Sequence, residues 1–137
     1  MLTFRAGFVV LALVVAGLDA GFWWLTRSPH QTTARIGFVA GFVLLLALLA
    51  AVAGLVRWEV AAPLAAASTS GLFVVGAAAI FSVGLGFLLA AVVEAALVRR
   101  LVLSASPAGW RGGTGLISSA AAVVPAVLFA AGLLLLR

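Results

Sequence analysis

The sequence predicts an all-α fold, a polytopic integral membrane protein whose four transmembrane helices form one bundle. Composition is the first reason: 66% of the 137 residues are hydrophobic and 8% are charged. A soluble domain carries about 25% charged residues, because its surface must face water. A chain this short has a large surface for its volume, so a water-soluble core could not enclose so many apolar side chains. The second reason is that the apolar residues fall into four long runs.

Each of these runs is long enough to cross a bilayer, which takes roughly 20 residues at about 1.5 Å of rise per residue. We expect one membrane domain over residues 1–137, with helices over residues 4–25, 36–56, 71–98 and 114–136. The first run is expected to be a retained helix, because Leu18 stands where signal-peptide cleavage needs a small residue. Between the runs lie the segments TRSPHQTTAR, RWEVAAPLAAASTS and RRLVLSASPAGWRGG, each with a proline and at least one arginine. They are predicted to be turns at the membrane surface.

Tryptophan and arginine mark the expected membrane boundaries. Tyrosine is absent, so the aromatic residues that anchor helices at the interface must be tryptophans, here Trp23, Trp24, Trp58 and Trp110. In a four-span bundle one face would carry Arg27, Arg35, Arg99, Arg100 and Arg111, and the other face Arg5, Arg57 and Arg137. Because positive residues are retained in the cytoplasm, the first and third loops are predicted to be cytoplasmic and both termini external.

Glycines inside the runs mark candidate helix-packing surfaces. Two small-xxx-small patterns occur, one formed by Gly17 and Gly21 and the other by Gly37 and Gly41, and Gly84 lies in a third notched stretch. Helices in lipid associate through close van der Waals contact, which small residues permit. We expect these glycines to pack this chain's own helices together. The alternative is that one notched face docks a partner subunit.

Two of the three acidic residues are surrounded by apolar sequence. Glu59 follows the second run and is interfacial, whereas Asp19 lies about 6 Å of rise inside Trp23 and Glu94 about 7.5 Å before Arg99. In a four-span chain the first and third helices run parallel, so both acids would lie at similar depth near one face. Arginines or water at the headgroups would then satisfy them. The alternatives are a shared proton or cation site, in which the acids act together, and an ion pair with a partner subunit.

Several function classes find no support in the sequence. Cysteine is absent and His30 is the one histidine, so thiolate metal sites, thiol catalysis and haem held by two histidines of this chain are excluded. The basic residues are spread along the chain, whereas nucleic-acid binding needs a basic cluster on one folded surface. No grouping of acid, base and nucleophile can be assembled. We therefore expect no enzyme activity, no cofactor and no nucleic-acid partner.

The remaining classes are those of a protein embedded in a bilayer, and we expect the cytoplasmic membrane of a bacterium or archaeon. The favoured hypothesis is a small integral subunit that stabilises or helps assemble a larger membrane protein complex, with other integral subunits or copies of itself as partners. It rests on the short loops and the many small residues. The alternative is a small homo-oligomeric transporter or channel that uses Asp19 and Glu94 for protons or cations.

Overall fold

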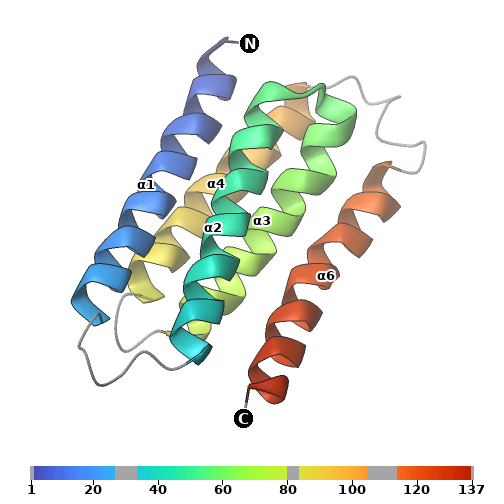
Figure 1. Cartoon of the computed structure of the whole chain (residues 1–137). Helices are drawn as coiled ribbons and strands as arrows, with labels where there is room; N and C mark the ends of the chain where they lie inside the picture. The colour runs from blue at the N-terminus through green and yellow to red at the C-terminus, as the bar shows by residue number, and fades with distance from the viewer. Residues whose placement is uncertain (1, 27–33, 80–83, 105–113, 137) are drawn as a thin grey trace.

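The computed structural model describes residues 2–26, 34–79, 84–104 and 114–136. Within these ranges lie the helices α1 (Leu2–Thr26), α2 (Ala34–Leu55), α3 (Trp58–Ala78), α4 (Gly84–Ser104) and α6 (Thr114–Leu135). The helices run alternately in opposite directions, side by side in one bundle (Figure 1). We call the end where α1 and α3 begin the N-terminal end of the bundle, and the end where α1 finishes the C-terminal end.

The all-α membrane fold is confirmed. Four of the described helices, α1, α2, α3 and α6, are long and apolar enough to cross a membrane. Their outer faces carry large apolar side chains, among them Leu13, Leu48 and Leu116, which are more than half exposed. Such a surface suits lipid as the surrounding solvent. Helix α4 has the same length as α3, but three charged residues lie within it, Glu94, Arg99 and Arg100.

The predicted third helix, residues 71–98, is wrong. These residues belong to two helices, because α3 ends at Ala78 and α4 begins at Gly84. The predicted turn over residues 57–70 is helical instead, with Pro63 near the start of α3, where it removes one hydrogen bond close to the helix end. The hydroxyl cluster that follows also fits a helix, since Ser70 Oγ lies 3.1 Å from the carbonyl oxygen of Ala67, one turn earlier in the same helix.

The additional helix reverses the direction of α4 relative to α1. Gly7, early in α1, lies against Leu97, late in α4, whereas Leu18 lies against Gly86. The two helices are therefore antiparallel, and not parallel as a four-span chain requires. As a result α1 begins and α6 ends at opposite ends of the bundle (Figure 1).

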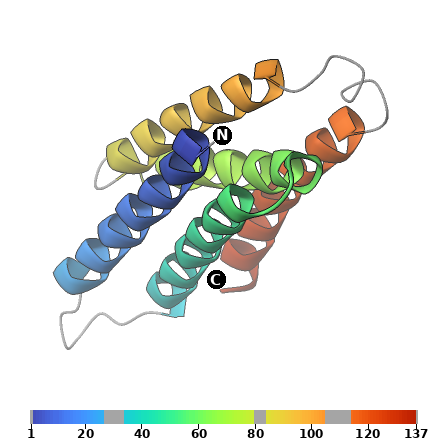
Figure 2. The same cartoon turned by 90° about the horizontal axis from the view of Figure 1, so that it is seen from above.

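Helix α3 holds the bundle together. It packs against α2, α4 and α6, while α1 packs against α2 and α4. A central apolar cluster includes Val15, Val43 and Leu72, and a second cluster at the N-terminal end is built around Phe8 and Ala61. Helix α6 lies on the side of α3 away from α1 (Figure 2).

Two polar bonds and three aromatic rings hold α6 in place. Ser70 Oγ on α3 donates to the carbonyl of Ala122 at 2.6 Å. The ring of Phe129 lies 5.2 Å from that of Phe42 and 6.2 Å from that of Phe38, centroid to centroid. Arg35 Nε at the start of α2 donates to the carbonyl of Leu136 at 2.8 Å.

The arginines group differently from the four-span prediction, and that grouping is wrong. Among the described residues, the N-terminal end carries Arg5, Arg57, Arg99 and Arg100, and the C-terminal end carries Arg35. Arg27, Arg111 and Arg137 lie outside the described residues. By the positive-inside rule we expect, from the described arginines, a cytoplasmic N-terminal end.

A cysteine-accessibility experiment tests this topology, and the chain offers a cysteine-free background. Ala34 and Ser104 are both exposed helix-terminal residues, at the C-terminal and N-terminal ends of the bundle respectively. In intact cells an impermeant thiol reagent should label Ala34→Cys, whereas Ser104→Cys should react only after permeabilisation. Labelling of both variants from the same side would contradict the five-helix arrangement.

Candidate functional site

Glu94 is the middle residue of α4, and its side chain is fully buried, with 0% exposure. The four-span prediction places Glu94 near a helix end, whereas it lies ten residues from either end of α4. The reason is that α4 continues past Arg99 and Arg100 to Ser104. Long arginine side chains can lie a turn inside a helix end and extend their charged groups toward the interface, and Arg99 lies within α4 and does not mark its end.

Ser68 of α3 contacts Glu94 where three helices meet. Its hydroxyl oxygen lies 3.1 Å from Glu94 Oε2 and 3.0 Å from the carbonyl oxygen of Leu46 on α2. Ser68 is itself fully buried and is the middle residue of α3. The small residues Ala65 and Ala91, both buried, stand beside this contact and let α3 and α4 approach closely.

The hydroxyl of Ser68 has one proton, so it cannot donate to both neighbours at once. In one arrangement it donates to an ionised Glu94, and the Leu46 carbonyl is only a neighbour. In the other it donates to Leu46, and a neutral Glu94 carboxyl donates its own proton to Ser68. The second arrangement uses both short distances as hydrogen bonds, because a helical carbonyl can accept a second bond.

Two buried oxygen atoms next to this contact have unused hydrogen-bonding capacity. Glu94 Oε1 and Thr69 Oγ1 are both buried and make no hydrogen bond. Nearly all buried polar atoms in proteins have a hydrogen-bond partner, so two buried oxygens without one are unusual. The middle of the bundle therefore holds a small polar cluster, formed by Ser68, Thr69 and Glu94, within apolar surroundings.

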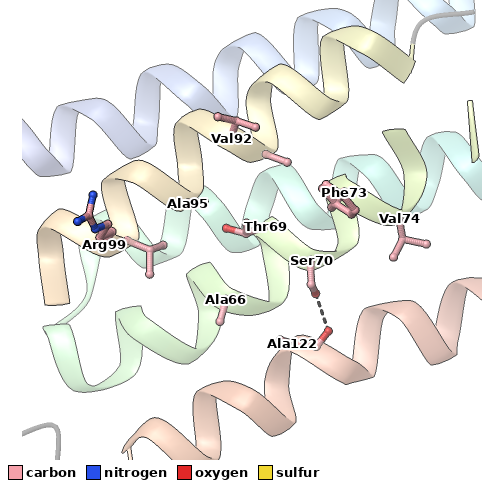
Figure 3. Close-up of a pocket in the computed structure, with 11 residues that line it drawn as sticks. Ala66, Thr69, Ser70, Phe73, Val74, Val92, Ala95, Arg99 and Ala122 are labelled. Atoms are coloured by element: carbon pink, nitrogen blue, oxygen red, sulfur yellow. Dashed lines mark hydrogen bonds between the residues drawn. The ribbon is translucent and has the colours of Figure 1, made fainter. Parts of the chain in front are cut away.

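A groove between α3, α4 and α6 passes beside this cluster (Figure 3). Its volume is about 690 Å³, and its walls include Thr69 and Ser70 from α3, Ala95 and Arg99 from α4, and Ala122 from α6. Thr69 thus belongs to both the groove wall and the polar cluster. A second groove of about 640 Å³ separates α1 from α4 and is lined by apolar residues only.

Asp19 does not share a site with Glu94. Leu18 lies against Gly86, and Glu94 lies about two helical turns further along α4, roughly 12 Å of rise. The expectation of similar depth is wrong because α1 and α4 are antiparallel. Asp19 is 8% exposed, and its Oδ1 is buried without a hydrogen bond.

The glycines of the two small-xxx-small patterns do not pack against any other helix that the structure describes. A Cβ atom added at Gly17, Gly21, Gly37 or Gly41 would meet nothing within 4 Å. The expected contacts within the chain are therefore absent at these four positions. Gly84, by contrast, lies in close contact with Gly76 and Ala79. Gly54 is a further close-packed position, because an added Cβ would lie 2.9 Å from Phe8 Cβ.

The residues expected at the interface lie near helix ends where they are described. Trp23 and Trp24 are in the last turn of α1, and Trp24 is 76% exposed. Trp58 is the first residue of α3. Arg99 and Arg100 are exposed near the end of α4. Trp110, Arg27 and Arg111 lie outside the described residues.

Sequence reasoning missed Ser68 and Thr69, because the STS cluster was assigned to a surface turn. The signal that could have found them is the length of the alanine-rich run around the cluster, which is sufficient for a helix of its own. Comparisons of this chain with protein-family models, curated proteins and solved structures find no match.

Proposed function

We propose that this chain is a small transporter that carries protons across the membrane and that Glu94 is the residue that binds and releases them. The observation that carries the proposal is the position of Glu94, fully buried at the middle of α4. Ionisable residues inside the membrane are costly, and they commonly belong to ion pathways or proton relays. The same residue near a membrane face would be much weaker support for a proton pathway.

The hydrogen-bonding distances around Glu94 support the proposal that its carboxyl group binds a proton. A neutral carboxyl accounts for both short distances from Ser68, to Glu94 Oε2 and to the Leu46 carbonyl. Within the described residues no arginine is paired with Glu94. An ionised carboxylate would be buried without a compensating cation, which is expensive.

The groove beside the polar cluster supports a route by which protons reach and leave the Glu94 carboxyl group. Thr69 lies in the groove wall with an unused hydroxyl oxygen, and Ala91 and Ala95 flank Glu94 on the same helix and also line the groove. The polar cluster therefore reaches the groove at Thr69, with the small side chains of Ala91 and Ala95 beside Glu94. A modest movement of α4 would open the carboxyl to the groove, whereas a Glu94 enclosed by large side chains would need extensive repacking.

Proton flux in liposomes containing this chain alone tests the proposal. A potassium gradient with valinomycin should drive proton uptake in the unmodified protein, read by an entrapped pH-sensitive dye. Glu94→Gln keeps the size and much of the hydrogen bonding but removes the titratable proton, so it should abolish the flux. Glu59→Gln is the matched control, because Glu59 is an exposed acid in the first turn of α3.

The flux result decides the proposal only if the variants fold. Thermal unfolding in detergent should give similar midpoints for the unmodified protein, Glu94→Gln and Glu59→Gln. Absence of flux in the folded unmodified protein would refute the proposal. Undiminished flux in Glu94→Gln would refute the role of Glu94.

A second candidate function, a subunit of a larger membrane complex, is favoured by the exposed glycines of α1 and α2. Among the described helices, none contacts Gly17, Gly21, Gly37 or Gly41, and a glycine face is a surface that another helix can approach closely. Identification of the chains recovered with the protein in mild detergent tests this candidate. Recovery of this chain alone would count against it.

A further inference from the structure

The groove between α3, α4 and α6 has a shape that suits an elongated apolar ligand. Helices α4 and α6 both pack on α3 but make no extensive contact with each other, so the α3 surface between them is uncovered. The volume of about 690 Å³ lies within the range of roughly 300–1,000 Å³ that is usual for ligand pockets. The groove follows the helices, with Phe73 and Val74 toward one end and Arg99 at the other (Figure 3).

The lining combines apolar side chains with two hydroxyl groups and, among the described residues, one cation. Phe73, Val74 and Val92 supply large apolar groups, and Arg99 supplies the guanidinium. Along α4 the distance from Val92 to Arg99 is about 10 Å of rise, which fits within one leaflet, about 15 Å, half of the hydrocarbon layer. Within the described residues no acidic side chain is paired with Arg99.

We place the guanidinium of Arg99 at the depth of lipid headgroups, which a long arginine side chain can reach from a turn inside a helix end. It stands about one turn before the end of α4, at the bundle end that also carries Arg5, Arg57 and Arg100. Basic pockets between transmembrane helices bind anionic headgroups, and a guanidinium can hold a phosphate through two parallel hydrogen bonds. An apolar groove that ends at such a cation is complementary to a molecule with an acyl chain and an acidic head.

We propose that this groove is a binding site for an anionic phospholipid. An acyl chain lies along α3 between α4 and α6, and the phosphate contacts Arg99. The proposal concerns the groove and is independent of proton transport through Glu94. It distinguishes Arg99 from Arg100, the next residue, which is also exposed but does not line the groove.

Native mass spectrometry of the full-length protein in detergent tests the site, with phosphatidylglycerol and phosphatidylcholine of identical acyl chains as probes. We expect the protein to retain phosphatidylglycerol in preference to phosphatidylcholine. Arg99→Gln should weaken phosphatidylglycerol binding by about fivefold, and Arg100→Gln should weaken it much less.

A second pair of variants tests whether the lipid occupies the groove itself. Ala95 and Ala96 are both exposed on α4, but only Ala95 lines the groove. Ala95→Trp should block phosphatidylglycerol binding, and Ala96→Trp should leave it intact. Equal thermal unfolding midpoints for the two variants would establish that both fold.

Three results would overturn the proposal. One is equal retention of the two lipids, which would mean that any bilayer lipid fills the groove. Another is an equal loss of phosphatidylglycerol binding in Arg99→Gln and Arg100→Gln, which would indicate that the lipid responds to general surface charge and not to a specific site. The third is a dimer that Ala95→Trp dissociates, since a helix of a second copy would then occupy the groove.

Discussion

Replacing Gly54 with leucine should lower the free energy of unfolding by about 3 kcal/mol, the upper part of the usual range for overpacking a well-packed core. Gly54 is buried where α2 crosses α1, and an added Cβ would lie 2.9 Å from Phe8 Cβ and 3.1 Å from the carbonyl oxygen of Arg5. The backbone oxygen cannot move without displacing α1. The two helices would therefore separate, and the apolar cluster around Phe8 would lose contacts.

Gly41→Leu is the matched control on the same helix. Gly41 is exposed and has no neighbour within 4 Å of an added Cβ, so leucine there extends into lipid and also raises helix propensity. Thermal unfolding in detergent should show a clear decrease of the midpoint for Gly54→Leu and no decrease for Gly41→Leu. Equal midpoints for the two variants would contradict the packing of α1 against α2.

The bounds of three helices, the first two and the last along the chain, could be predicted closely. Those expected over residues 4–25, 36–56 and 114–136 correspond to α1, α2 and α6 within two residues at each end. Apolar runs of this length have one stable form in lipid, because a helix satisfies its own backbone hydrogen bonds. The helix bounds within residues 57–98 are harder to predict, because Pro63 and the hydroxyl cluster near Ser70 are typical of turns and yet occur within α3.

Which helix faces pack together could not be predicted. The helices are apolar on all sides, so the sequence pattern does not distinguish a face that meets protein from one that meets lipid. Gly41 and Gly54 lie on the same helix in similar apolar surroundings, but only Gly54 is buried. Their environments follow from how α2 is rotated against α1, and that rotation depends on the packing of the whole bundle.

The candidate site could be predicted in part. Glu94 is identifiable as an unusual acid from its apolar surroundings, but its position at the middle of a helix is not, because Arg99 and Arg100 resemble a helix end at a membrane boundary. Its partner Ser68 was missed, since it lies in the segment predicted as a turn before the third helix, which is part of α3. The alternative of a site shared by Asp19 and Glu94 required parallel helices, and α1 and α4 are antiparallel.

The second prediction with a large expected effect concerns the protonation state of the Glu94 carboxyl group. A carboxyl group that is fully buried at the middle of α4, with Ser68 placed between it and the Leu46 carbonyl, should be neutral in the folded protein at neutral pH. The physical reason is that a neutral carboxyl supplies the hydrogen that this chain of contacts requires. An ionised group would remain buried without a cation beside it.

Infrared difference spectroscopy of the purified protein at neutral pH tests this claim most directly. The unmodified protein should show the C=O stretching band of a protonated carboxylic acid, and Glu94→Gln should lose that band. Glu59→Gln should retain the band, because Glu59 is exposed to solvent. A spectrum in which the Glu94→Gln substitution removes carboxylate bands, and no protonated band, would contradict the account.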